Sequence, residues 1–182
     1  MSYQREKIRN VAIVGSGGSG KTSLVEAILF NAKLTTRLGK VEEGNTVSDF
    51  NPDEIARNSS IYTSLCSFDS GGIKLNLLDT PGYYDFVGDT ISALTAADAA
   101  IFVFGANSHI DASFDYLWEA CSSKPKLIFI NKTDKEDLDL SKIHSMLTDF
   151  DKSIVFFSVP DSTGAKFSKT ISPNQHSQTF LG

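Results

Sequence analysis

Short apolar runs rich in β-branched and aromatic residues alternate along this chain with stretches in which apolar residues recur at helical spacing. The runs predict strands at residues 8–14, 61–68, 73–78, 99–104, 126–130 and 153–157, and the helical spacing predicts helices at 21–31, 85–96, Phe114 to Cys121 and 140–149. Apolar strands that alternate with helices are typical of a mostly parallel sheet. The fold class that the pattern predicts is therefore α/β.

Three polar stretches interrupt this pattern. Residues 35–60 contain glycines and a proline without a lasting period, which predicts a long, partly mobile loop. The sequence DSGG at 69–72 predicts a hairpin turn between two of the strands. Residues 161–182 are rich in Ser, Thr, Gln and Asn, so we expect a loosely ordered tail there. The predicted organisation is one domain over residues 1–160, followed by this tail.

Composition narrows the choice of partners. The 182 residues carry a net charge of −5, which argues against nucleic acid held by bulk charge, and no sequence-specific nucleic-acid binding is expected. Cys66 and Cys121 lie far apart and outside any CxxC pattern, which predicts free thiols in a reducing compartment. No apolar run reaches the ~18 residues of a membrane span and the amino terminus lacks a signal-like apolar region. We therefore expect no membrane association and a cytoplasmic location.

A glycine-rich motif, GSGGSGKT, lies between the first predicted strand and the first predicted helix. It matches the P-loop pattern G-x-x-x-x-G-K-[ST], in which glycines let successive backbone amides point at phosphates and the helix N-terminus adds a favourable dipole. The lysine neutralises β- and γ-phosphate charge and the threonine hydroxyl coordinates Mg²⁺. The predicted nucleotide-binding residues here are Gly15, Ser16, Gly17, Gly18, Ser19, Gly20, Lys21, Thr22 and Ser23.

Two further motifs follow strands that should lie near the P-loop. LNLLDTPG places Asp79 at a strand end, where a carboxylate holds Mg²⁺ through water, and Gly82 where an amide approaches a γ-phosphate. NKTD, after the strand at 126–130, places Asp134 where a carboxylate accepts two hydrogen bonds from the N1–H and 2-amino groups of guanine. Asn131 is expected to tie this loop to the P-loop and the stem of Lys132 to cover the base. The three motifs together predict binding of GTP and GDP.

Four stretches carry a family resemblance: VAIVGSGGSGKTSLVEAILF, GNTVSDFNPDEIARNSSI, LNLLDTPGYYDFVGDTISAL and IFINKTD. In this order they resemble the GTP-binding domain of translation elongation factor G, and more closely its elongation-factor-G-like paralogues, over residues 5 to about 160. The resemblance implies a P-loop NTPase fold with three α/β/α layers and identifies residues 35–60 as switch I. It also implies that Ser60 joins Thr22 and Asp79 as a Mg²⁺ ligand and that the ribosome is a partner.

Two departures from the family pattern bear on hydrolysis. Lys21 and Tyr83 are the candidate catalytic residues, but Tyr83 stands where the family usually has the histidine that orients the attacking water. A phenol is a poor proton acceptor at neutral pH, and loss of such a group costs about 10²- to 10⁴-fold in rate. Gly18 stands where elongation factor G usually has Asp. We therefore expect slow intrinsic GTP hydrolysis, and whether this chain acts as an enzyme stays open.

The carboxyl-terminal part leaves two interpretations. SIVFFSVPDSTG resembles the start of the subdomain that the family inserts before its guanine-closing motif, so the G domain would be incomplete on this side. The other interpretation makes Ser158 and Val159 a degenerate closing motif. We favour the first because no helical period follows. The leading prediction is the GTP-binding domain of an elongation-factor-G-like GTPase. The alternatives are a truncated guanine-nucleotide-binding module without turnover and an ATP-using P-loop enzyme.

Overall fold

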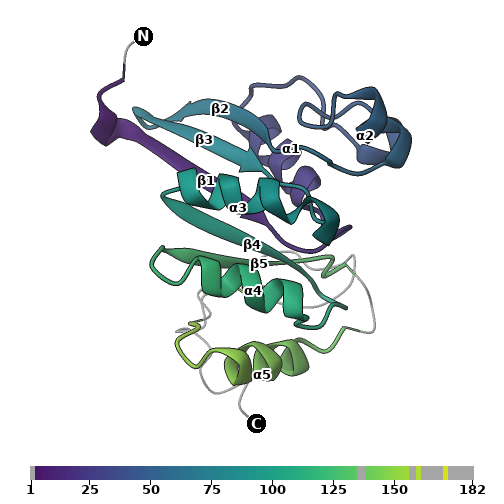
Figure 1. The fold of residues 1–182 in the computed structure, drawn as a ribbon, viewed down its shortest axis with the longest axis vertical. Helices are drawn as coiled ribbons and strands as arrows, with labels where there is room; N and C mark the ends of the chain where they lie inside the picture. Colours follow the sequence, from purple (N-terminus) through teal and green to yellow (C-terminus); the bar gives the residue numbers. More distant parts are fainter. Residues whose placement is uncertain (1–2, 135–137, 156–158, 161–169, 172–182) are drawn as a thin grey trace. The chain divides into compact units, whose positions relative to one another are not determined.

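The computed structural model describes residues 3–134, 138–155, 159–160 and 170–171. The chain forms two compact units, residues 1–131 and 132–182. The first unit contains the sheet and the second contains α5 (Figure 1). The predicted domain boundary near residue 160 stays a prediction.

A five-stranded sheet with the order β2-β3-β1-β4-β5 forms the centre of the first unit. Its strands are β1 (Ile8–Val14), β2 (Ser64–Ser70), β3 (Ile73–Asp79), β4 (Ala99–Gly105) and β5 (Lys126–Asn131). All neighbours pair in parallel except β2 and β3, which are antiparallel. The prediction of a mostly parallel sheet is confirmed. The parallel strands end at one edge of the sheet, and the predicted site residues follow these ends.

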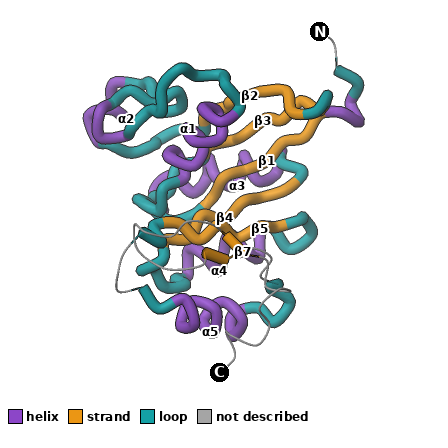
Figure 2. Tube along the Cα trace, turned by 180° about the vertical axis from the view of Figure 1, so that it is seen from behind, coloured by secondary structure: helices purple, strands orange, loops and turns teal. Residues whose placement is uncertain are grey.

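Helices cover both faces of this sheet, which confirms the predicted three-layer architecture. The helices of the first unit are α1 (Lys21–Asn31), the short α2 (Pro52–Arg57), α3 (Val87–Ala96) and α4 (Ala112–Ala120), with single 3-10 turns at η1 (Arg5–Lys7), η2 (Val41–Glu43) and η3 (Tyr84–Phe86). Figure 1 shows α3 and α4 in front of the sheet, and Figure 2, from the opposite side, shows α1 in front. No described helix is both long enough and apolar enough to span a lipid bilayer.

Alternate residues of the central strands fill two separate layers of core. On the α1 face, Ile13 and Val103 belong to one buried cluster with Val25 of the helix. On the opposite face, the buried Phe102 ring lies 5.3 Å from the Phe114 ring and 5.0 Å from the Trp118 ring, centroid to centroid. Side chains that alternate between two covered faces explain why these strands are apolar throughout.

The hairpin between β2 and β3 has a tighter turn than the four residues predicted. Ser70 pairs with Ile73, so the turn consists of Gly71 and Gly72, whose φ angles are +61° and +79°. Positive φ at both central residues is the geometry that glycine adopts without strain, and it matches the twist of the flanking strands. The prediction of a hairpin is correct, but β2 extends into the stretch assigned to the turn.

The stretch 35–60 contains a helix that was not predicted. The helix α2 begins after Asn51, which forms a capping box with Glu54 and is followed by proline at the first helical position. This Asn-Pro-x-Glu arrangement is a recognisable helix start. The expectation of an irregular loop is therefore wrong for α2 and for the 3-10 turn at Val41–Glu43.

Glu54 organises the segment between α2 and β2. Its carboxylate is 0% exposed and accepts hydrogen bonds from the backbone amides of Ile61, at 2.9 Å, and Tyr62, at 3.1 Å. These amides are therefore not available to a sheet ladder. This explains why β2 begins at Ser64 and not at residue 61 as predicted.

Glu26 anchors the earlier part of the same stretch to α1. Its side chain is 1% exposed, and its two carboxylate oxygens accept from the amides of Gly39, at 3.1 Å, and Val47, at 2.5 Å. Hydrogen bonds to a charged acceptor are the strong ones, and a buried carboxylate needs them. Two buried glutamates, one on α1 and one on α2, thus hold a long connection that has little regular structure.

The second unit contains α5 (Leu140–Phe150), capped by Asp139, which accepts from the amides of Ser141 and Lys142. The strand predicted at 153–157 is wrong for residues 153–155, because Ser153 and Ile154 belong to a turn in which the amide of Ile154 donates to the carbonyl of Asp151. Residues 156–158 lie outside the described part.

One strand pair in this unit was not predicted. The strand β6 (Val159–Pro160) pairs in antiparallel fashion with β7 (Thr170–Ile171), which lies in the stretch expected to be a tail. The rest of the predicted tail, 161–169 and 172–182, lies outside the described residues.

Candidate functional site

The turn between β1 and α1 has the conformation that its glycines were predicted to permit. Gly15, Gly18 and Gly20 have φ angles of +145°, +70° and +97°. A Cβ atom on Gly15 would lie 2.3 Å from the carbonyl oxygen of Val103, and one on Gly20 would lie 2.1 Å from Nδ2 of Asn131. Glycine is therefore required at both ends of the turn, by backbone conformation and by close packing.

Lys21 begins α1 and is 6% exposed. Its Nζ donates to the carbonyl oxygens of Gly15, at 3.0 Å, and Ser16, at 3.1 Å, so the turn wraps around the ammonium group. Burial lowers the pKa of Lys21 to about 8, while Asp79 and Asp49 oppose this change. The side chain remains mostly protonated at neutral pH and presents a poorly solvated positive charge, which favours an anionic ligand.

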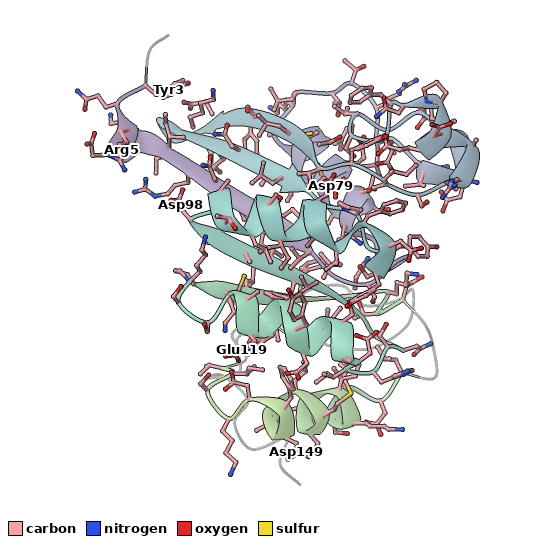
Figure 3. All side chains as sticks on the ribbon, viewed as in Figure 1. Tyr3, Arg5, Asp79, Asp98, Glu119 and Asp149 are labelled. Atoms are coloured by element: carbon pink, nitrogen blue, oxygen red, sulfur yellow. The ribbon has the colours of Figure 1, made fainter. Side chains whose placement is uncertain are left out.

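Three oxygen-bearing side chains from separate elements meet beside this lysine. The hydroxyl of Thr22 in α1 donates to Oδ2 of Asp79 at 2.9 Å and lies 3.3 Å from the hydroxyl oxygen of Ser60. Figure 3 shows Asp79 at the end of β3. The other carboxylate oxygen, Oδ1, is buried without a hydrogen bond among the described residues. A buried carboxylate and two hydroxyls form a donor set that suits a small, hard cation such as Mg²⁺.

The electrostatics of Asp79 agree with this fit. The side chain is 1% exposed, and burial raises its pKa from 3.8 to about 6, with Asp49 adding to the rise and Ser48, Lys21 and Thr22 opposing it. The charged form is therefore costly without a further positive group. A divalent cation at Oδ1 would offset this cost.

This cost predicts how the stability of the metal-free chain depends on pH. A raised carboxyl pKa means that the folded state binds the proton more tightly than the unfolded state does. Protonated Asp79 therefore contributes to the stability of the fold below pH 4, and this contribution is lost as the pH rises through 6. Asp79→Asn should raise the free energy of unfolding at pH 7.5 by up to about 3 kcal/mol and flatten the pH dependence between 4 and 6. Urea unfolding in EDTA measures both quantities.

The exposed carboxylate of Asp115 on α4 provides the control for this experiment, because Asp115→Asn should change neither quantity. Equal pH slopes for the Asp79→Asn variant and the unmodified chain would contradict the account of Asp79.

Hydrogen bonds from two threonines, Thr80 and Thr90, hold the segment after β3 in place. The amide and the hydroxyl of Thr80 donate to the carbonyl oxygen of Ile13, at 3.3 and 2.7 Å, and the hydroxyl of Thr90 donates to the carbonyl oxygen of Pro81 at 3.1 Å. The turn that follows brings Gly82 against the P-loop. A Cβ on Gly82 would lie 2.3 Å from Nζ of Lys21.

Asn131, the last residue of β5, is joined to the P-loop. Its Nδ2 donates to the carbonyl oxygen of Ser19 at 2.9 Å, which is the tie expected from the NKTD motif. Lys132 has a positive φ of 62° and, with Asp134, belongs to the second unit. Their roles toward guanine stay predictions.

Sequence reasoning missed two buried polar residues next to the site. Ser48 and Asp49 are 1% and 5% exposed, and both influence the pKa of Asp79. Burial raises the pKa of Asp49 itself. Both residues belong to the stretch GNTVSDFNPDEIARNSSI, whose resemblance identified the segment without giving these two positions a role.

The site thus combines a glycine turn around a buried lysine, an oxygen cluster beside it and a hydrogen bond from the asparagine that ends β5. A family model described as the elongation factor Tu GTP binding domain matches residues 6–171. The chain belongs to this family of GTP-binding domains. Membership confirms the predicted P-loop NTPase fold and the predicted class of ligand, a guanine nucleotide.

This GTP-binding domain is similar to two kinds of curated protein. It is 46% identical to an elongation factor G-like protein of Mycobacterium tuberculosis over 129 residues, which are 70% of this chain and 18% of that protein. It is 37% identical to the mitochondrial ribosome-releasing factor 2 of Drosophila melanogaster over 145 residues, which are 79% of this chain and 20% of that protein. The chain thus spans about a fifth of the length of these relatives.

A solved structure agrees with these likenesses. A crystal structure of a protein from Thermus thermophilus superposes with a TM-score of 0.85 at 33% identity, over 91% of this chain and 25% of that one. The resemblance to the GTP-binding domain of elongation-factor-G-like proteins, first read from four stretches of sequence, is therefore confirmed.

Proposed function

We propose that this GTP-binding domain is the Mg²⁺-dependent nucleotide switch of an elongation-factor-G-like translational GTPase, with slow intrinsic hydrolysis. The observation that carries the proposal is the meeting of Thr22, Ser60 and Asp79 beside the buried ammonium group of Lys21. Oxygen ligands next to a phosphate-binding lysine are what a magnesium–nucleotide complex needs.

Each residue of the site has a proposed role that follows from its chemistry. Lys21 and the P-loop amides hold the phosphates, and Asp134 accepts from the guanine edge, next to Lys132. Thr22, Ser60 and Asp79 would hold Mg²⁺, which when bound would supply positive charge next to the phosphates. Gly82 offers its amide to the γ-phosphate, so the turn after β3 senses which nucleotide is bound.

Slow turnover follows from the side chain at position 83. Tyr83 directly follows the residue assigned to γ-phosphate sensing, but a protonated phenol is a weak acceptor for the proton of an attacking water. The domain retains groups for binding and lacks a good base at this position. We therefore assign this domain a role that depends on binding and switching, with only slow hydrolysis of GTP.

The partner of the whole protein is proposed from its relatives. One is named an elongation factor G-like protein and another a mitochondrial ribosome-releasing factor. We propose that the ribosome is the partner and the cytoplasm the location. The chain spans only about a fifth of these relatives, so binding to ribosomes is to be tested separately from binding to nucleotide.

Calorimetric titration with GDP and with a non-hydrolysable GTP analogue, each with and without Mg²⁺, tests the proposal. At 100 times its dissociation constant the nucleotide should raise the free energy of unfolding by about 2.7 kcal/mol, and Mg²⁺ should tighten binding. ATP at the same concentration is the control and should give little heat. Absence of both heat and a rise in the free energy of unfolding, with GDP and with the analogue alike, would refute the proposal.

A second candidate, a module that binds guanine nucleotide without turnover, is favoured by Tyr83 alone. Steady-state hydrolysis of GTP with and without ribosomes separates the two functions. Turnover that ribosomes stimulate would exclude the second candidate. Binding without any turnover in either condition would support it.

A further inference from the structure

The aromatic ring of Tyr83 lies over Gly17 of the P-loop. A Cβ atom added to Gly17 would lie 3.1 Å from Cζ, 3.2 Å from Cε1 and 3.3 Å from Cε2 of this ring. The φ angle of Gly17 lies outside the left-handed region, so its backbone would accept a side chain. The outer edge of the Tyr83 ring therefore packs closely against this glycine.

The residue before Tyr83 occupies a second position on the P-loop. A Cβ atom on Gly82 would lie 2.3 Å from Nζ of Lys21 and 2.8 Å from the amide nitrogen of Gly17. Both nitrogens are hydrogen-bond donors of the kind that hold phosphate oxygens. The turn at 82–83 thus lies directly on donors that a terminal phosphate would use.

The turn can move from Gly82 onward, because the residues before it are held in place. Thr80 is fixed to the carbonyl oxygen of Ile13, and Pro81 accepts from the buried hydroxyl of Thr90. Gly82 is the next residue, and glycine absorbs changes in backbone angles with little strain. The side chain of Tyr83 is 54% exposed, so its contact with Gly17 can be broken without opening the core.

We propose that Tyr83, seated on Gly17, makes this domain select GDP over GTP. A γ-phosphate needs room between Gly82 and Lys21, so the turn must lift before a triphosphate fits, whereas a diphosphate has no γ-phosphate to displace it. Contacts that hold the turn down then count against GTP only, because a ligand shifts an equilibrium by its differential affinity for the two states. This inference rests on the proposed guanine-nucleotide binding and adds which nucleotide state is favoured.

The test measures the ratio of the dissociation constants of a non-hydrolysable GTP analogue and GDP, by calorimetry in Mg²⁺ buffer. Tyr83→Ala removes the ring and should lower the ratio about fivefold or more, mainly by tightening the analogue.

Two further variants test whether the effect belongs to the aromatic ring of Tyr83 and to this position. Tyr83→Phe keeps the ring and should keep the ratio of the unmodified chain. Tyr84→Ala removes a neighbouring tyrosine that is 68% exposed and should also leave the ratio unchanged. A drop in the ratio for Tyr84→Ala equal to that for Tyr83→Ala would overturn the assignment to Tyr83.

A ratio within twofold of the unmodified chain in Tyr83→Ala would overturn the inference while leaving nucleotide binding intact. Lack of binding of both nucleotides by the unmodified chain would instead overturn the proposed function and the inference with it. The two failures are thus distinguishable in one set of titrations.

Discussion

Asp134→Asn should change the base preference of this domain from guanine to xanthine. A carboxylate accepts two hydrogen bonds from the N1–H and 2-amino groups of guanine, and an amide cannot accept both. Loss of two bonds to a charged group is worth about 3 to 4 kcal/mol, so GDP binding should weaken about 10²- to 10³-fold. Xanthosine diphosphate, which carries an oxygen where guanine has its amino group, should bind more tightly to the variant than to the unmodified chain.

Competition against a fluorescent guanine nucleotide measures both affinities. Asp149→Asn is the matched control, because Asp149 is an exposed carboxylate of the same unit, on α5. Its removal should change neither affinity. If Asp134→Asn retains the original preference for guanine, the assignment of Asp134 as the base-reading residue is wrong.

Tyr83→His should accelerate single-turnover GTP hydrolysis about 100-fold or more. Imidazole is a much better acceptor than a protonated phenol for the proton of the attacking water at neutral pH, and a general base contributes about 10²- to 10⁴-fold. The measurement is release of phosphate from a preformed complex with GTP. Tyr84→His places the same imidazole one residue further along and should leave the rate unchanged.

An unchanged rate in Tyr83→His would show that the missing histidine does not limit turnover. Gly18→Asp then becomes the decisive variant. A Cβ on Gly18 would meet nothing within 4 Å, and Asp tolerates the positive φ of 70° better than most residues. A gain in rate there would assign the limit to the P-loop.

The central sheet could be predicted because its signal is local. The β-branched run at 8–14 coincides with β1, and the helical spacing from Lys21 to Asn31 coincides with α1. The start of β2 could not be predicted in this way. The amides of Ile61 and Tyr62 are taken by the carboxylate of Glu54, and a pattern of apolar residues does not contain this contact.

The site, like the fold, could be predicted only where the signal is local in the sequence. Motifs located Lys21, Asp79 and Asn131 because each begins or ends a regular element, and the end of that element fixes where the side chain lies. The contact of Tyr83 with Gly17 joins two turns that are distant in sequence, and no motif describes it. The sequence alone identified Tyr83 as the wrong side chain for a base without indicating what its ring contacts.

The two buried glutamates have a mechanical consequence for the stretch between α1 and β2. Glu26 lies on the helix that begins with Lys21, and Glu54 lies on α2 within the stretch itself. A buried carboxylate that loses its partners costs several kcal/mol, so an arrangement in which some amides stay and others leave is unfavourable. Each of the two carboxylates therefore favours keeping both of its amide partners together, and the helix that begins with Lys21 carries one of these two anchors.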